Sequence, residues 1–206
     1  MALVKYNNNS ISAITTTGIP SGSLVPIKTL TASSSETLSF VHGTDGVVLD
    51  STYPIYKFEF INIHPATNDI QFQFNLSTDG GSNYNVTKTT TFFRAYHADS
   101  GIGGVLEYRT ANDLAQSTSF QALAIDLDNI SDASSAGSMS LYNPTSTTYV
   151  KHFIGRMTSH SSGSYSYDLF TAGYGNTTSA INAVQFKMSS GNIDDGKIKL
   201  YGIKDS

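Results

Sequence analysis

Hydrophobic and polar residues alternate with a period of two through the middle of the chain. Residues 56–60 and 70–77 both follow this pattern, and the apolar side shifts by one position at residues 61–63. Successive side chains of a strand point to opposite faces, so both segments are predicted strands, with a β-bulge or two covered faces at the shift. We expect the two strands to form a hairpin. The predicted inward residues are Tyr56, Phe58, Phe60, Ile70, Phe72, Phe74 and Leu76.

Turn-forming residues separate these segments from further predicted strands. Asp79, Gly80 and Gly81 tolerate positive φ angles and are typical of a turn. The further strands are predicted at residues 84–93, 138–142, 148–154, 167–172, 183–188 and 197–203. Residues 94–137 are irregular, and we expect loops there with at most one short helix at 112–116. A total of roughly seven to nine strands without a helical period indicates an all-β fold, an antiparallel β-sandwich or jelly roll.

The first part of the chain shows no such alternation. Residues 1–37 scatter short apolar pairs among Asn, Ser, Thr and Gly. Such a stretch buries little surface alone, so ordering its backbone requires another surface to lie on. We therefore predict an extended N-terminal arm at residues 1–37 that attaches the protein to a partner, followed by a single β-sandwich domain at residues 38–206. The candidate attachment residues are Leu3, Val4, Tyr6, Ile11 and Ile14.

Composition restricts the chemistry of the chain. Ser, Thr and Asn occupy 66 of 206 positions, cysteine and tryptophan are absent, and the net charge is −4. The absence of a Lys/Arg cluster argues against nucleic acid as a partner. No run reaches the roughly 18 apolar residues of a membrane span, so we expect no membrane insertion. Residues 1–9 lack the apolar stretch of a signal peptide, so we expect export by lysis or on a particle.

Catalytic and metal-binding motifs are weak, and we expect no catalytic residue, no metal and no cofactor. Asp126, Asp128 and Asp132 resemble a calcium loop only in part, because the glycine and final glutamate of an EF-hand are missing. A solvated acidic loop is the favoured interpretation, and ion binding there stays open. Two carboxylates about 5 to 9 Å apart on distant strands would still allow a glycan depolymerase. The histidines share no metal-binding spacing; they are His42, His64, His97, His152 and His160.

Tyrosines near predicted turns are the candidate binding residues. An aromatic face accepts the C–H groups of a sugar ring, and nearby Asn, Ser and Asp accept or donate hydrogen bonds to its hydroxyls. The alternative is that the rings pack the edges of the sandwich or a subunit interface, and the absence of tryptophan counts against a lectin. The candidate glycan-binding residues are Tyr96, Tyr108, Tyr165, Tyr167 and Tyr174.

Several segments of the chain resemble one known family. They include residues 60–66 (FINIHPA), 74–84 (FNLSTDGGSNY) and 172–180 (AGYGNTTSA). Residues 1–7, 184–193 and 196–204 belong to the same resemblance. Together these segments are similar to virion structural proteins of tailed phages of marine bacteria, especially cyanophages, with residues 94–135 and 155–168 as the variable parts.

The resemblance implies an externally mounted particle component, either tail-fibre-like or capsid-decorating, and it brings no catalytic motif. We therefore expect a non-enzymatic virion protein, assembled in the host cytoplasm and released by lysis. Its expected partners are other virion proteins through the arm, copies of itself in a homotrimer, and host-surface glycan. Capsid decoration is the alternative function, and a glycan depolymerase is the more remote one.

Overall fold

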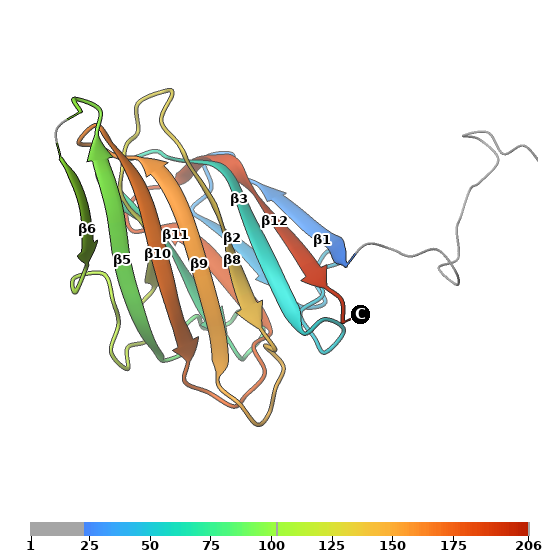
Figure 1. The fold of residues 1–206 in the computed structure, drawn as a ribbon. Helices are drawn as coiled ribbons and strands as arrows, with labels where there is room; N and C mark the ends of the chain where they lie inside the picture. Colours follow the sequence, from blue (N-terminus) through green and yellow to red (C-terminus); the bar gives the residue numbers. More distant parts are fainter. Residues whose placement is uncertain (1–22, 102, 206) are drawn as a thin grey trace, which may run out of the picture.

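The computed structural model describes residues 23–101 and 103–205, which form strands joined by turns and loops (Figure 1). One sheet, the large sheet, has eight strands. In spatial order they are β1 (Leu24–Thr31), β12 (Ile193–Ile203), β3 (Ile55–Pro65), β8 (Ser135–Tyr142), β9 (Lys151–His160), β10 (Tyr165–Gly175), β5 (Lys88–Ala98) and β6 (Gly104–Tyr108). The small sheet contains β2 (Thr37–Val41), β11 (Ala183–Met188), β4 (Ile70–Ser77) and β7 (Gln121–Leu127).

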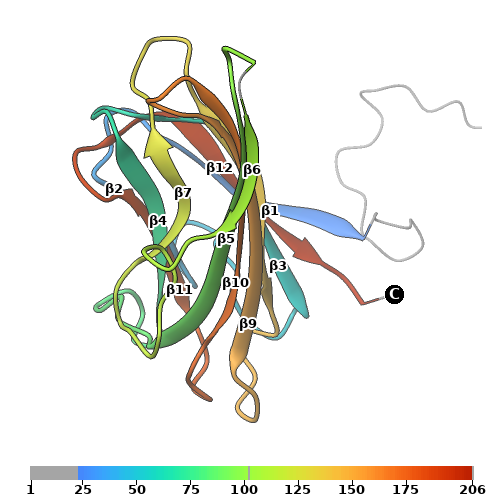
Figure 2. The same ribbon diagram turned by 60° about the vertical axis from the view of Figure 1, so that its left-hand side comes forward.

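The two sheets lie face to face as two layers, and all their strand pairs are antiparallel (Figure 2). This confirms the prediction of an all-β antiparallel sandwich. The described residues form twelve strands, and four of them, β1, β2, β6 and β7, are absent from the predicted set. Residues 112–116 form turns and loop rather than a helix.

A cluster of phenylalanine rings fills the space between the sheets. Phe186 of the small sheet lies at its centre, with ring centroids 5.2 Å from those of Phe58 and Phe60 of the large sheet. Phe72 and Phe74 are fully buried beside it. Every predicted inward residue of the two alternating segments is buried, so the prediction of the inward face is confirmed. Large aromatic side chains dominate the hydrophobic stabilisation of such a core.

The predicted hairpin between residues 56–63 and 70–77 is wrong, because these strands lie in opposite sheets. β3 pairs with β12 and β8, whereas β4 pairs with β11 and β7. The link between them crosses from one layer to the other, and their apolar faces meet across the core. The predicted β-bulge is present, since the β3–β8 register shifts between Phe60 and Ile63 and Asn62 has a φ of 52°.

The predicted boundary between arm and domain at residue 37 is also wrong. Leu24–Thr31 forms β1, which pairs with β12 along its length, so the described sandwich begins at β1. Strand β1 is an edge strand whose side chains are only half-buried or exposed, so it lacks the clear alternation of a strand with one buried face. The candidate attachment residues Leu3, Val4, Tyr6, Ile11 and Ile14 lie outside the described residues.

Candidate functional site

The large sheet has one face on the core and one face that no other described element covers, which we call the outer face (Figures 1 and 2). Strand β9 shows the division most clearly. Phe153 and Met157 point to the core and are buried, while Ile154 and Arg156 point outward and are exposed. An antiparallel sheet with one solvated face ordinarily carries polar residues there. Exposed apolar side chains on the outer face therefore need an explanation.

Aromatic side chains form a row across the outer face. Phe170 on β10 and Phe93 on β5 are directly paired, and their rings stack with centroids 4.7 Å apart and planes 7° apart. Tyr108 on β6 is paired with Phe93 and is 51% exposed. On the other side, the Arg156 guanidinium lies 4.8 Å from the Phe170 ring centroid. We call the three rings of Phe93, Phe170 and Tyr108, together with the Arg156 guanidinium that covers one end, the aromatic row.

An apolar hollow of about 460 Å³ lies beside this row on the outer face. Its floor includes Ala172 and Gly173, and its walls include Tyr142, Ile154 and Tyr174. A Cβ on Gly173 would lie 2.5 Å from a backbone carbonyl oxygen of β5, so a larger residue there would push the strands apart.

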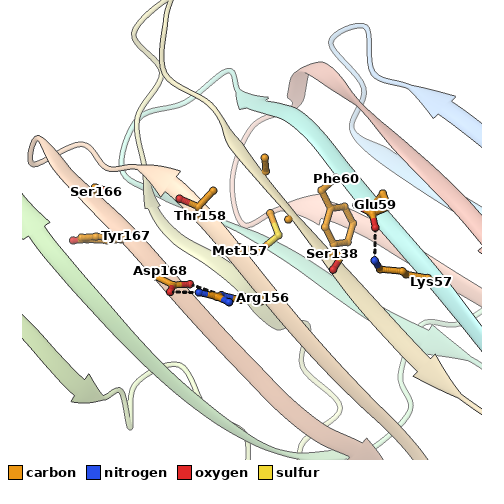
Figure 3. Close-up of a pocket in the computed structure, with 12 residues that line it drawn as sticks. Lys57, Glu59, Phe60, Ser138, Arg156, Met157, Thr158, Ser166, Tyr167 and Asp168 are labelled. Carbon is orange, nitrogen blue, oxygen red and sulfur yellow. Dashed lines mark hydrogen bonds and ion pairs between the residues drawn. The ribbon is translucent and has the colours of Figure 1, made fainter.

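A polar hollow of about 610 Å³ lies over β3, β8, β9 and β10 of the same face (Figure 3). Two ion pairs border it. Arg156 Nε donates to Asp168 Oδ1 at 2.9 Å, and its Nη2 donates to Asp168 Oδ2 at 2.7 Å. In the second pair, Lys57 Nζ lies 2.5 Å from Glu59 Oε1. The hydrogen bond with Asp168, together with its charge, raises the pKa of Arg156. Exposed pairs of this kind add little stability, so their polar groups can bind a ligand at little cost to the fold.

Three of the five predicted glycan-binding tyrosines, Tyr96, Tyr165 and Tyr167, face the space between the sheets. Tyr167 is only 6% exposed, and Tyr96 and Tyr165 pack on the core beside it. Arg94 lies 4.7 Å from the ring centroid of Tyr96 and 4.8 Å from that of Tyr167. The structure packs these three rings along the core as the alternative describes: Tyr167 is buried, and Tyr96 and Tyr165 are partly exposed.

Arg94 ties this tyrosine cluster to the small sheet. Its Nη1 donates to Asp126 Oδ2 at 2.9 Å, and its Nε donates to Glu107 Oε1 at 2.8 Å. Burial would lower the pKa of Arg94, but the bond to Glu107 and the nearby charges raise it above its usual value. Burial also raises the pKa of Tyr167, whose hydroxyl donates to Asp126 at 3.2 Å. This arrangement joins β5 and β10 to β7.

The other two predicted tyrosines, Tyr108 and Tyr174, lie on the outer face. Tyr108 belongs to the aromatic row, and its hydroxyl donates to Asp113 at 2.5 Å, a bond that raises the Tyr108 pKa. Tyr174 forms a wall of the apolar hollow and makes an edge contact with His152 at 6.0 Å between ring centroids. The structure thus brings only these two to a common surface, at different points along it.

The acidic segment at residues 126–132 is only partly solvated. Asp126 is bound by Arg94 and Tyr167, and Asp128 is buried with a carboxylate oxygen 3.5 Å from His160 Nδ1. Asp132 is exposed. Within residues 23–101 and 103–205, no three His, Asp or Glu side chains form a group that could hold a metal ion.

The aromatic row and the hollows also contain residues that the sequence analysis did not select. Phe93, Phe170 and Ile154 are the main ones. A usable signal was present in the adjacent pair Phe92 and Phe93, because neighbouring strand residues point to opposite faces and one ring must therefore face outward. Phe92 is fully buried and Phe93 is 36% exposed.

Comparisons of the chain with protein-family models, with curated proteins and with solved structures find no match. The described part of the chain contains no helix long and apolar enough to cross a membrane.

Proposed function

We propose that the chain is a non-enzymatic structural protein on the exterior of a phage particle and that the outer face is its contact surface. The observation that carries this proposal is the aromatic row on a sheet face that no other described element covers. Contiguous exposed apolar groups rimmed by polar ones are typical of interaction sites. The resemblance of the sequence to virion proteins of marine phages supplies the biological setting.

Host-surface glycan is the proposed ligand, in a tail-fibre-like role. The polar hollow offers the donors Lys57 and Arg156 and the acceptors Glu59 and Asp168 within one depression (Figure 3). Such groups suit the hydroxyls of a saccharide, and the neighbouring aromatic edges suit its C–H groups. The exposed ion pairs exchange readily with ligand hydroxyls because water already screens them.

The apolar hollow favours a second function, capsid decoration. Its walls of Tyr142, Ile154 and Tyr174 and its floor of Ala172 and Gly173 suit an apolar side chain of a neighbouring protein better than a sugar. Buried aromatic and aliphatic anchors of this kind provide most of the energy in protein–protein contacts. In this role the outer face lies against the capsid rather than toward the host.

Adsorption to host cells and binding to capsids separate these two functions. The test variant carries Tyr108→Ser, Phe170→Ser and Tyr174→Ser, and the matched control carries Tyr149→Ser, an exposed tyrosine on a loop that borders neither hollow. We expect the triple variant to lose adsorption while the control retains it. Loss of capsid binding with no adsorption by wild type would support decoration instead. Release of reducing ends from the glycan would contradict the non-enzymatic assignment, and unchanged binding to both targets would overturn the outer-face proposal.

A further inference from the structure

Strand β6 is an edge of the large sheet, and among the described strands it pairs only with β5. Its neighbouring residues Val105 and Leu106 point to opposite faces, yet they are 40% and 73% exposed. Val105 is exposed because the small sheet ends at β7, which packs on β9 and β10 and does not reach across from β6, and Leu106 is exposed because it lies on the uncovered outer face. The strand therefore exposes one backbone edge and apolar side chains on both faces.

The two edges of the large sheet differ in their protection against strand pairing. At the opposite edge, β1 carries Pro26 and Lys28, and its register shifts between them. Proline, lysine and bulges are the devices that natural sheets use to block unwanted pairing. Strand β6 contains neither proline nor lysine, and its register with β5 runs without a shift. Strand β6 is short and carries one inward-pointing charge, Glu107, which Arg94 neutralises, so of these two edges β6 is the less protected against strand addition.

We infer that β6 pairs with β6 of a second copy of the chain, antiparallel and about a two-fold axis at Leu106. Antiparallel pairing of identical strands is self-complementary, as a two-fold interface requires. This register sets Leu106 opposite Leu106 of the second copy, Val105 opposite Glu107, and Gly104 opposite Tyr108. All five residues of the strand are then paired.

A two-fold axis could also pass through Val105 or Glu107 and still place the outer faces of both copies on the same side of the joined sheet. Charge and strand length favour the axis at Leu106. A shift of the axis to Glu107 would place the two Glu107 carboxylates directly opposite each other, which is destabilising. A shift to Val105 would leave Tyr108 without a partner inside the five-residue strand of the second copy. With the axis at Leu106, Glu107 meets Val105 and keeps its own cations, Arg94 at 2.8 Å and Arg109 at 3.3 Å.

The pairing of Gly104 with Tyr108 is also favourable. Gly104 has no side chain, and a Cβ built on it would make only ordinary van der Waals contacts, at 3.7 Å to His97 and Tyr96, so the space above the residue is not obstructed. The half-exposed ring of Tyr108 from the second copy fills this space, as aromatic residues do opposite glycines on sheet edges. The aromatic row of each copy would then continue onto the neighbouring sheet.

The size of the contact predicts its strength. A five-residue pair exchanges roughly four to six backbone hydrogen bonds. It buries less than the ~1,200 Å² of standard stable interfaces, so the dimer should form and dissociate with concentration. A two-fold strand pair gives an even number of chains, whereas a homotrimer is expected from the sequence. The molar mass in solution distinguishes the two.

The absence of cysteine from the chain allows a direct test of register. In the predicted pairing the two Leu106 Cα atoms lie roughly 4.5 to 5.5 Å apart, within the range that a disulfide spans. We expect Leu106→Cys to form a covalent dimer rapidly when an oxidant is added. Two controls are Val105→Cys, which faces Glu107 rather than itself, and Leu24→Cys, an exposed position on the opposite edge. Both should cross-link at least tenfold more slowly.

Molar mass measured by light scattering from about 1 µM to 1 mM completes the test. We expect the wild type to shift from monomer to dimer, and Leu106→Lys to stay monomeric because it places two cations opposite each other. A trimer, or a monomer at every concentration, would overturn the inference. So would cross-linking of Val105→Cys or Leu24→Cys as fast as that of Leu106→Cys.

Discussion

Replacement of Lys88 by methionine should change how the stability of the protein depends on pH. The Lys88 side chain is fully buried between the sheets, where its Nζ donates to Asn75 Oδ1 at 2.5 Å and to the Val86 carbonyl at 2.8 Å. No carboxylate of the described residues forms an ion pair with it. Burial without a counter-charge lowers the Lys88 pKa from 10.5 to about 7.

The direction and size of the effect follow from proton linkage. Between pH values near 7 and 10.5 the unfolded chain holds a proton on Lys88 that the folded chain does not. The free energy of unfolding therefore rises with pH in this window, by up to about 1.4 kcal/mol per pH unit. Over the whole window the Lys88 contribution is on the order of 5 kcal/mol. Below pH 7 the folded protein carries the full cost of a buried charge.

The assay is urea unfolding followed by far-ultraviolet circular dichroism at a series of pH values from about 7 to 9.5, inside the window set by the two pKa values. Lys88→Met keeps most of the length of the side chain and removes its charge, so its unfolding free energy should rise less with pH than that of the wild type. Lys57→Met, which loses only a half-exposed ion pair, should follow the wild type. Other groups titrate equally in all three proteins. Parallel curves for the wild type and Lys88→Met would refute the reasoning.

Three further predictions concern packing and chain boundaries. Phe72→Ala should lower the free energy of unfolding by ~3 to 5 kcal/mol, while Gln73→Ala, on the other face of β4, should change it little. Similar melting temperatures for the two variants and the wild type would mean that the inward face of β4 is assigned wrongly. Gly173→Ala should lower the melting temperature, because its Cβ meets β5 backbone at 2.5 Å, and an unchanged value would contradict that close approach. Deletion of residues 1–22 should leave the melting temperature unchanged and abolish attachment to particles, whereas deletion of 1–31 also removes β1 and should destabilise the fold. Circular dichroism measures the melting temperature of each truncated protein, and a particle-binding assay measures its attachment. Equal melting temperatures for the two truncations would show that β1 contributes nothing to stability.

The faces of individual strands could be predicted from the sequence, because alternation is a local property. The inward positions of β3 and β4 and the bulge at Asn62 all follow from neighbouring residues. Strand pairing could not be predicted in this way. The partner of β1 is β12, at the other end of the described chain, and the strand after β3 crosses to the other sheet.

The candidate site shows the same limit. Tyr165, Tyr167 and Tyr174 all belong to β10, yet the first two face the core and the third faces outward. The odd spacing between Tyr167 and Tyr174 agrees with this difference, but alternation alone does not say which face is covered. That depends on which face of the large sheet the small sheet packs against, and the small sheet is assembled from strands far apart in the sequence.

The position of β12 has a consequence for how the protein folds. This strand follows all the other described strands along the chain, yet it lies between β1 and β3 in the large sheet. During synthesis β1 and β3 therefore emerge long before the strand that joins them, and each has an unpaired edge until then. Contacts between such distant segments close slowly, and open strand edges favour aggregation. Completion of the large sheet must follow the synthesis of residues 193–203, so chains interrupted before this point should be aggregation-prone.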